Sequence, residues 1–186
     1  MRQQCASPLS EEVLTEYWAR ELEGEREAAV EEHLFNCSDC GTRLKTLAAM
    51  GAGVVELARQ GRISGIISRA LVNLLQSESV NVRLYTVSPG ETIPCAVFPD
   101  DDMVVLSMRA DLTDVDTVNL RVTGPDDMPF GEALDVPIPP GSSEVLWATP
   151  GVIVRAMPST RLQLTLQAPG RSAALGEYVL DHHAQP

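Results

Sequence analysis

Residues 33–40 read His33-Leu-Phe-Asn-Cys37-Ser-Asp-Cys40, an HxxxCxxC segment that decides how the first part of the chain folds. His33 and Cys37 are one helical turn apart, and Cys37 and Cys40 bracket a tight turn. The three side chains can therefore face one point near the end of one helix and the start of the next. Thiolate and imidazole groups are the donors of tetrahedral zinc sites, so the segment predicts a zinc site.

Cys5 is the expected fourth ligand. It lies just before the first predicted helix, and antiparallel pairing of the first two helices would return it to the level of residues 33–40. A closed shell of three cysteines and one histidine leaves no open position for water, which predicts one structural Zn²⁺ and no hydrolysis. The alternative is a Cys5 outside the shell, with water or a carboxylate of Asp39 or Glu32 in its place.

Apolar residues recur at helical spacing around this segment. They predict a helix before Gly24, a second helix over residues 25–36, and a third from about residue 38 to residue 55. A fourth helix is predicted from the clearest amphipathic stripe in the chain, which consists of Ile63, Ile66, Ile67, Ala70, Leu71, Leu74 and Leu75. We expect this stripe to be buried on a partner or on the rest of the chain.

The sequence changes character near residues 77–79. Proline occurs once before this point, and short runs rich in β-branched residues follow it, separated by turns rich in Pro, Gly and Asp. The runs are VNVRLYTV, MVVLSMRA, VNLRVT, SEVLWAT, GVIVRAM, RLQLTLQA and GEYVL. We therefore predict an α+β protein of two domains. Residues 1–78 would form a zinc-bound bundle of three or four helices, and residues 79–186 an all-β antiparallel sandwich or small barrel.

Three further groups of side chains in the second domain are predicted to have no role at a site. Cys95, in ETIPCAVF, is expected to be a buried thiol on a strand. His182 and His183 fall in the tail DHHAQP, where a disordered end is expected rather than a pair of metal ligands. The acidic run at residues 100–102 follows a proline and is typical of a solvated turn.

Composition limits the classes of function. The formal net charge is −12, and such an acidic surface repels phosphate backbones, so direct nucleic-acid binding is not expected. The sequence contains no export signal, lipid-anchor motif or apolar run long enough to span a membrane, which predicts a cytoplasmic protein. It also lacks a phosphate-binding glycine loop, GxSxG and HExxH, so we do not expect an enzyme.

Over about residues 5–76 the chain resembles the zinc-binding anti-sigma domain of bacteria. The resemblance rests on Cys5, the HxxxCxxC segment, the helix-Gly-helix spacing with its acidic EGEREAAVEEH stretch, and the amphipathic segment that follows. In that family three helices form the zinc-bound bundle, and a fourth helix clamps with it around an extracytoplasmic-function sigma factor. The resemblance implies that Cys5, His33, Cys37 and Cys40 bind zinc and that the 63–75 stripe contacts the sigma factor.

The function implied by this resemblance is that of a cytoplasmic, zinc-dependent anti-sigma factor. Its β-domain would modulate release of the sigma factor in response to a signal. The alternative is a zinc-stabilised adaptor or homodimerising regulatory protein that binds no sigma factor. Because zinc-bound thiolates can be oxidised with loss of the metal, a thiol-oxidant switch at the zinc site is a further hypothesis.

Overall fold

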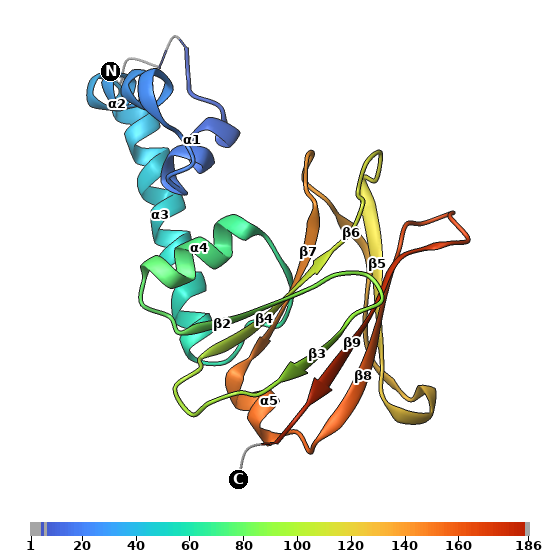
Figure 1. The fold of residues 1–186 in the computed structure, drawn as a ribbon. Helices are drawn as coiled ribbons and strands as arrows, with labels where there is room; N and C mark the ends of the chain where they lie inside the picture. Colours follow the sequence, from blue (N-terminus) through green and yellow to red (C-terminus); the bar gives the residue numbers. More distant parts are fainter. Residues whose placement is uncertain (1–4, 6, 185–186) are drawn as a thin grey trace. The chain divides into compact units, whose positions relative to one another are not determined.

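The computed structural model describes residues 5 and 7–184. It is an α+β structure in which helices precede two β-sheets (Figure 1). The chain divides into two compact units, unit 1 (Met1–Leu57) and unit 2 (Ala58–Pro186). The sequence predicts a boundary between residues 78 and 79 instead. The observed boundary is earlier because the segment after Leu57 contributes a strand and a helix to the β-rich unit.

The described residues of unit 1 form three helices: α1 (Glu11–Trp18), α2 (Gly24–Asn36) and α3 (Ser38–Arg59), of which the last two residues belong to unit 2. Ser10 is the N-cap of helix α1, and its hydroxyl accepts a hydrogen bond from the Val13 N–H at 3.2 Å. These helices supply the buried side chains Leu14, Val30, Cys40 and Val55, and Leu22 is added by the segment between α1 and α2. The helical periodicity of this region therefore predicted its helices correctly.

The predicted fourth helix begins later than the apolar stripe indicated. Residues Gly65–Ile67 form a short strand, β1, and helix α4 covers Arg69–Ser77. Gly65 has φ +138°, a conformation that favours glycine and interrupts the helix. The next two residues pair with β7, with Ile66 opposite Trp147. Ile63, Ile66 and Ile67 are therefore not on a helix, because strand pairing outweighed their helical spacing.

Unit 2 contains two sheets. One has the strand order β1-β7-β4-β2, with β2 (Val82–Val87), β4 (Met103–Arg109) and β7 (Glu144–Pro150). The other has the order β3-β9-β8-β5-β6, with β3 (Thr92–Cys95), β5 (Thr117–Thr123), β6 (Pro129–Pro137), β8 (Thr160–Gln167) and β9 (Ala174–His182).

The prediction of an all-antiparallel β-domain is wrong, because the sheets also contain parallel pairs of strands. Strand β2 runs parallel to β4, and β3 runs parallel to β9. Between β2 and β4 the chain crosses to the other sheet and forms β3, so β4 returns to the first sheet in the same direction as β2. Parallel neighbours require such a crossover connection, which the alternation of a single strand does not reveal.

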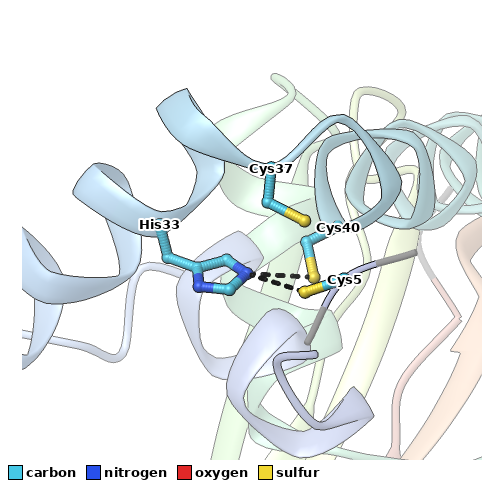
Figure 2. Close-up of side chains that lie close together, drawn as sticks. All are labelled: Cys5, His33, Cys37 and Cys40. Atoms are coloured by element: carbon cyan, nitrogen blue, oxygen red, sulfur yellow. Dashed lines mark hydrogen bonds between the residues drawn. The ribbon is translucent and has the colours of Figure 1, made fainter. Parts of the chain in front are cut away.

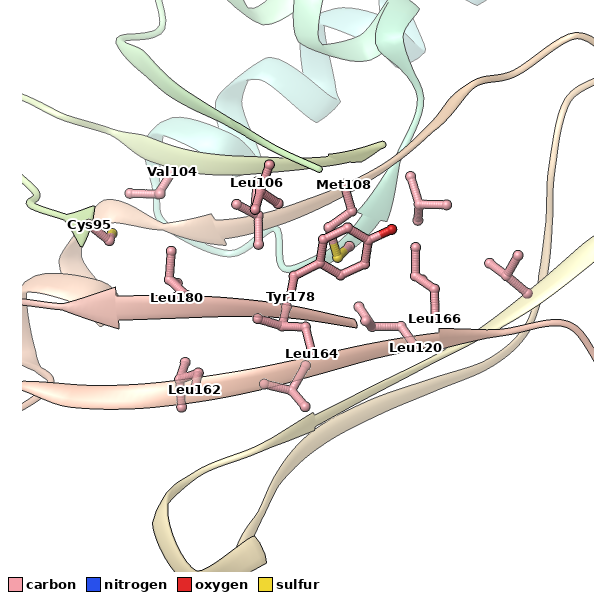
Figure 3. Packing of buried hydrophobic residues seen from close by; sticks show 14 of the residues in the cluster. Cys95, Val104, Leu106, Met108, Leu120, Leu162, Leu164, Leu166, Tyr178 and Leu180 are labelled. Atoms are coloured by element: carbon pink, nitrogen blue, oxygen red, sulfur yellow. The ribbon is translucent and has the colours of Figure 1, made fainter. Parts of the chain in front are cut away.

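Both sheets contribute to one hydrophobic core (Figure 3). Every second side chain of β4 points into this core, namely Val104, Leu106 and Met108. They face side chains of the other sheet, which are Leu162, Leu164 and Leu166 of β8 and Tyr178 and Leu180 of β9. The hydroxyl of Tyr178 is satisfied within the core, since it donates a hydrogen bond to the Arg109 carbonyl at 2.6 Å. Alternation with a period of two places every second side chain of these strands in the core.

Two helical segments interrupt the strands of unit 2. The run GVIVRAM, predicted as a strand, forms helix α5 (Gly151–Ala156), and Pro125–Asp127 form a 3₁₀ turn, η1. Gly151 begins α5 with its N–H donating to the Asp102 carbonyl at 2.8 Å, and a Cβ at this position would lie 2.0 Å from the Asp101 carbonyl oxygen.

In the described part of the chain, no helix combines the length and apolar character needed to cross a bilayer.

Candidate metal centre

Cys5, His33, Cys37 and Cys40 converge on one point in unit 1 (Figure 2). The three Sγ atoms and one imidazole nitrogen all lie within 4.8 Å of one another. His33 Nε2 is 3.3 Å from Cys40 Sγ and 3.7 Å from Cys5 Sγ. The predicted set of four ligands is therefore assembled by the fold.

The junction between α2 and α3 positions three of these side chains. His33 lies in the last turn of α2, and Cys40 lies in the first turn of α3. Cys37 is the single residue between the helices, and its extended backbone, with φ −123° and ψ 101°, ends α2. The helical turn between His33 and Cys37 and the start of α3 together turn all three donors to the same side.

Cys5 reaches the site from the segment before α1. Its backbone N–H donates to Asp39 Oδ2 at 3.3 Å, and Arg43 Nη1 donates to the Leu9 carbonyl at 2.6 Å. Both hydrogen bonds tie this segment to α3. Asp39, considered above as a substitute ligand, thus holds the backbone of Cys5 instead, while the Cys5 thiol occupies the fourth position.

Hydrogen bonds within the cluster alter the acidity of its thiols. The backbone N–H of Cys40 is the main cause that lowers the pKa of Cys37 to about 7, and the Cys5 side chain adds to this effect. The pKa of Cys5 is raised, chiefly by its hydrogen bond with Cys37. Since zinc binds thiolates, the lowered pKa of Cys37 favours loss of its proton when the metal binds.

The chemistry and spacing of the four donors fit zinc. Zn–S and Zn–N bonds of about 2.3 and 2.0–2.1 Å make the edges of a tetrahedral site roughly 3.5–3.8 Å long. The two nitrogen–sulfur distances, 3.3 and 3.7 Å, are close to those edges. The four residues therefore hold one structural Zn²⁺, and their closed Cys₃His shell leaves no position for a reacting water.

The predicted partner-binding stripe lies in unit 2 and is largely engaged there. Leu75 is fully buried, and Ile66 packs against the core of the two sheets. The other five members, Ile63, Ile67, Ala70, Leu71 and Leu74, are partly exposed. Leu75 cannot contact a partner, because α4 turns this side chain, together with Val72, into unit 2.

Two predictions about polar residues of unit 2 are wrong. His182 is a buried residue of β9, not part of a disordered tail, and its alternation with Tyr178 and Leu180 was the signal that the sequence offered. Asp101 is also buried, accepting hydrogen bonds from Arg83 Nε at 2.5 Å and from the Phe98 N–H at 2.7 Å.

The prediction that Cys95 is a buried strand thiol is confirmed.

A protein-family model matches part of unit 1. Residues 10–41, which run from the cap of α1 to the first turn of α3, match the model of a family described as "Putative zinc-finger". His33, Cys37 and Cys40 fall inside the match, whereas Cys5 precedes it. No curated protein matches this chain.

Proposed function

We propose that this chain is a zinc-dependent anti-sigma factor. The premise is that residues 10–41, which match the zinc-finger model, belong to the N-terminal zinc-finger family of anti-sigma proteins. Unit 1 would sequester an extracytoplasmic-function sigma factor, and unit 2 would modulate its release. The observation that carries the proposal is the closed cluster of Cys5, His33, Cys37 and Cys40, which makes unit 1 a metal-stabilised binding module. The proposal places the chain in the cytoplasm, where sigma factors act.

Two exposed apolar side chains of unit 1 support a protein-binding role. Phe35 is 91% exposed and lies between the zinc ligands His33 and Cys37, and Met50 on α3 is 64% exposed. Large apolar side chains this exposed are typical of surfaces that a protein partner covers. We propose Phe35 and Met50 as contacts for the sigma factor, together with the exposed parts of the 63–75 stripe.

Charge supports the same class of partner. Residues 1–40 contain ten acidic residues against three basic ones. A field of this sign favours association with a basic protein surface and opposes direct binding of nucleic acid.

For unit 2, the two sheets and their common core support a sandwich rather than a closed barrel. We propose a binding and regulatory role for both units, without catalysis.

Co-purification tests this function. The full chain is co-expressed with each extracytoplasmic-function sigma factor of its source genome, as wild type and with Phe35→Glu or Met50→Glu. The matched control is Val152→Glu, since Val152 is 56% exposed on α5 in unit 2. We expect one sigma factor to bind the wild type and the control equally, and about tenfold more weakly the variants of unit 1. Capture of no sigma factor would exclude the sequestering role.

A homodimeric regulatory protein is the second candidate, favoured by the exposed edge of unit 2. Strand β6 is the last strand of its sheet, and Phe130 and Leu134 on it are 47% and 60% exposed. An edge strand with exposed apolar side chains is suited to pairing with another chain. Analytical ultracentrifugation of the wild type and of Leu134→Glu distinguishes the candidates, because a dimer that the substitution dissociates would support pairing of two copies.

A further inference from the structure

Unit 2 contains a cavity that the zinc site does not explain. Its volume is about 50 Å³, and side chains of both sheets and of α5 line it. The lining is almost wholly apolar and includes Leu106, Leu162, Leu180 and the aromatic rings of Trp147 and Phe130. Among these, Leu106, Leu162 and Leu180 flank one end of the core (Figure 3). Small-molecule sites are typically concave and apolar with a few polar groups that orient the ligand.

His182 is a polar residue in the lining of this cavity, which also includes Thr149. Its side chain is 1% exposed, and neither Nδ1 nor Nε2 has a hydrogen-bond partner among the residues that the structure describes. His183 differs in both respects, since it is exposed and its Nε2 lies 3.6 Å from Asp181 Oδ2. A buried imidazole without a partner costs free energy, and a bound molecule that hydrogen-bonds to it would recover this cost.

Cys95, which also lines this cavity, is not suited to react with a bound molecule. Cys95 is the register partner of His182 in the parallel pair of β3 and β9, so the two side chains lie next to each other. Burial raises the pKa of Cys95 to about 11, which keeps the thiol protonated and a poor nucleophile at neutral pH. One thiol and one imidazole also provide too few donors for a closed metal shell.

We propose that this cavity binds a small aromatic molecule with one hydroxyl group, a phenol, whose hydroxyl hydrogen-bonds to His182. The rings of Trp147 and Phe130 offer aromatic contacts to such a ligand. A cavity of about 150 Å³ is needed to hold a benzene ring, so the observed space must widen. Phe130 and Ile153 line the cavity and are each 47% exposed, and the proposal requires their side chains to move outward when the ligand binds.

The test compares phenol with toluene, which replaces the hydroxyl by a methyl group of similar size. Affinities are measured by calorimetry on the full zinc-loaded chain, as wild type, His182→Leu and His183→Leu. We expect the ratio of phenol affinity to toluene affinity to fall about threefold to tenfold in His182→Leu, since one hydrogen bond is lost. The ratio should be unchanged in His183→Leu, which alters the exposed neighbour.

Ring ¹⁵N signals of the wild-type histidines provide a readout that does not depend on the folding of a variant. Phenol should shift the ring signals of His182 and leave those of His33 and His183 in place. Absence of phenol binding, an unchanged affinity ratio in His182→Leu, or a shift confined to His183 would each overturn the proposal. The outcome is independent of sigma-factor binding, because the cavity lies wholly in unit 2.

Discussion

The indole ring of Trp18 occupies the space that any side chain at Gly51 would require. A Cβ at position 51 would lie 2.1 Å from Cζ2 of Trp18, far inside van der Waals contact. Glycine normally weakens a helix interior by about 1 kcal/mol relative to alanine. In α3 the absence of a side chain at Gly51 outweighs this cost, because it allows α1 and α3 to approach each other closely.

Replacing Gly51 by Ala should therefore destabilise unit 1. Overpacking of this kind costs roughly 1–3 kcal/mol, which exceeds the gain in helix propensity. Gly53→Ala is the matched control, because position 53 has open space within 4 Å, and it should stabilise the helix by up to about 1 kcal/mol. Urea unfolding of the zinc-loaded chain, followed by helical circular dichroism, measures both changes. Equal effects of the two substitutions would contradict the contact with Trp18.

Removal of zinc should unfold unit 1 and leave unit 2 folded. The buried apolar side chains of unit 1 are few, and structural zinc contributes on the order of 10 kcal/mol to such small units. We expect elemental analysis to find one zinc per chain in the wild type and in Cys95→Ala, and almost none in Cys40→Ser. Chelation should abolish amide protection in α1 and α2 but not in the strands. Retained helicity after complete chelation would contradict a structural role for the metal.

Cys95 should resist alkylation as long as unit 2 is folded. Its side chain has no exposed surface, and burial raises its pKa to about 11, so less thiolate is present at pH 8 than for an ordinary cysteine. Iodoacetamide labelling at pH 8 with peptide mass mapping gives the extent of modification. After chelation Cys5, Cys37 and Cys40 should be labelled, which provides an internal control, whereas Cys95 should react only in denaturant. Labelling of Cys95 in the folded chain would refute its burial.

Glu144 should make the stability of unit 2 depend on acid pH. Burial alone raises the pKa of Glu144, but hydrogen bonds from Arg69 and Ser107 outweigh it and lower the pKa below its ordinary value. A carboxylate with a lowered folded-state pKa contributes its stability above the unfolded value of about 4.5, and loses it as the pH falls through the folded-state pKa. Stability should thus decrease below about pH 4.5.

The matched variants for this effect are Glu144→Gln and Glu177→Gln, both on strands. At pH 7 the first should cost about 1–2 kcal/mol, because it breaks a partly exposed pair with Arg69 on α4, and the second less than about 0.5 kcal/mol. Amide exchange in β4 and β7 reports on unit 2 alone, so loss of zinc in acid does not affect it. If Glu144→Gln has the same acid dependence as the wild type, another group is responsible.

Local spacing was sufficient to predict most of unit 1. His33 lies in the last turn of α2, and Cys37 follows directly after that helix, so their four-residue spacing brings them close together and can be read from sequence. Cys5 required the packing of α1 and α2, yet the closed zinc shell made its position predictable. Zinc chemistry thus adds a long-range constraint that the sequence displays directly.

The sequence by itself determined the ligands His33, Cys37 and Cys40, the α-to-β order and the alternation of the strands, since each depends on contacts between near neighbours. Only the tertiary structure decided whether Ile66 joins a helix or pairs with Trp147, and whether β2 and β4 run parallel. It also decided that His182 is buried without a partner beside Cys95. Pairings between distant segments compete with local preference, and their balance of free energies is absent from any short window of sequence.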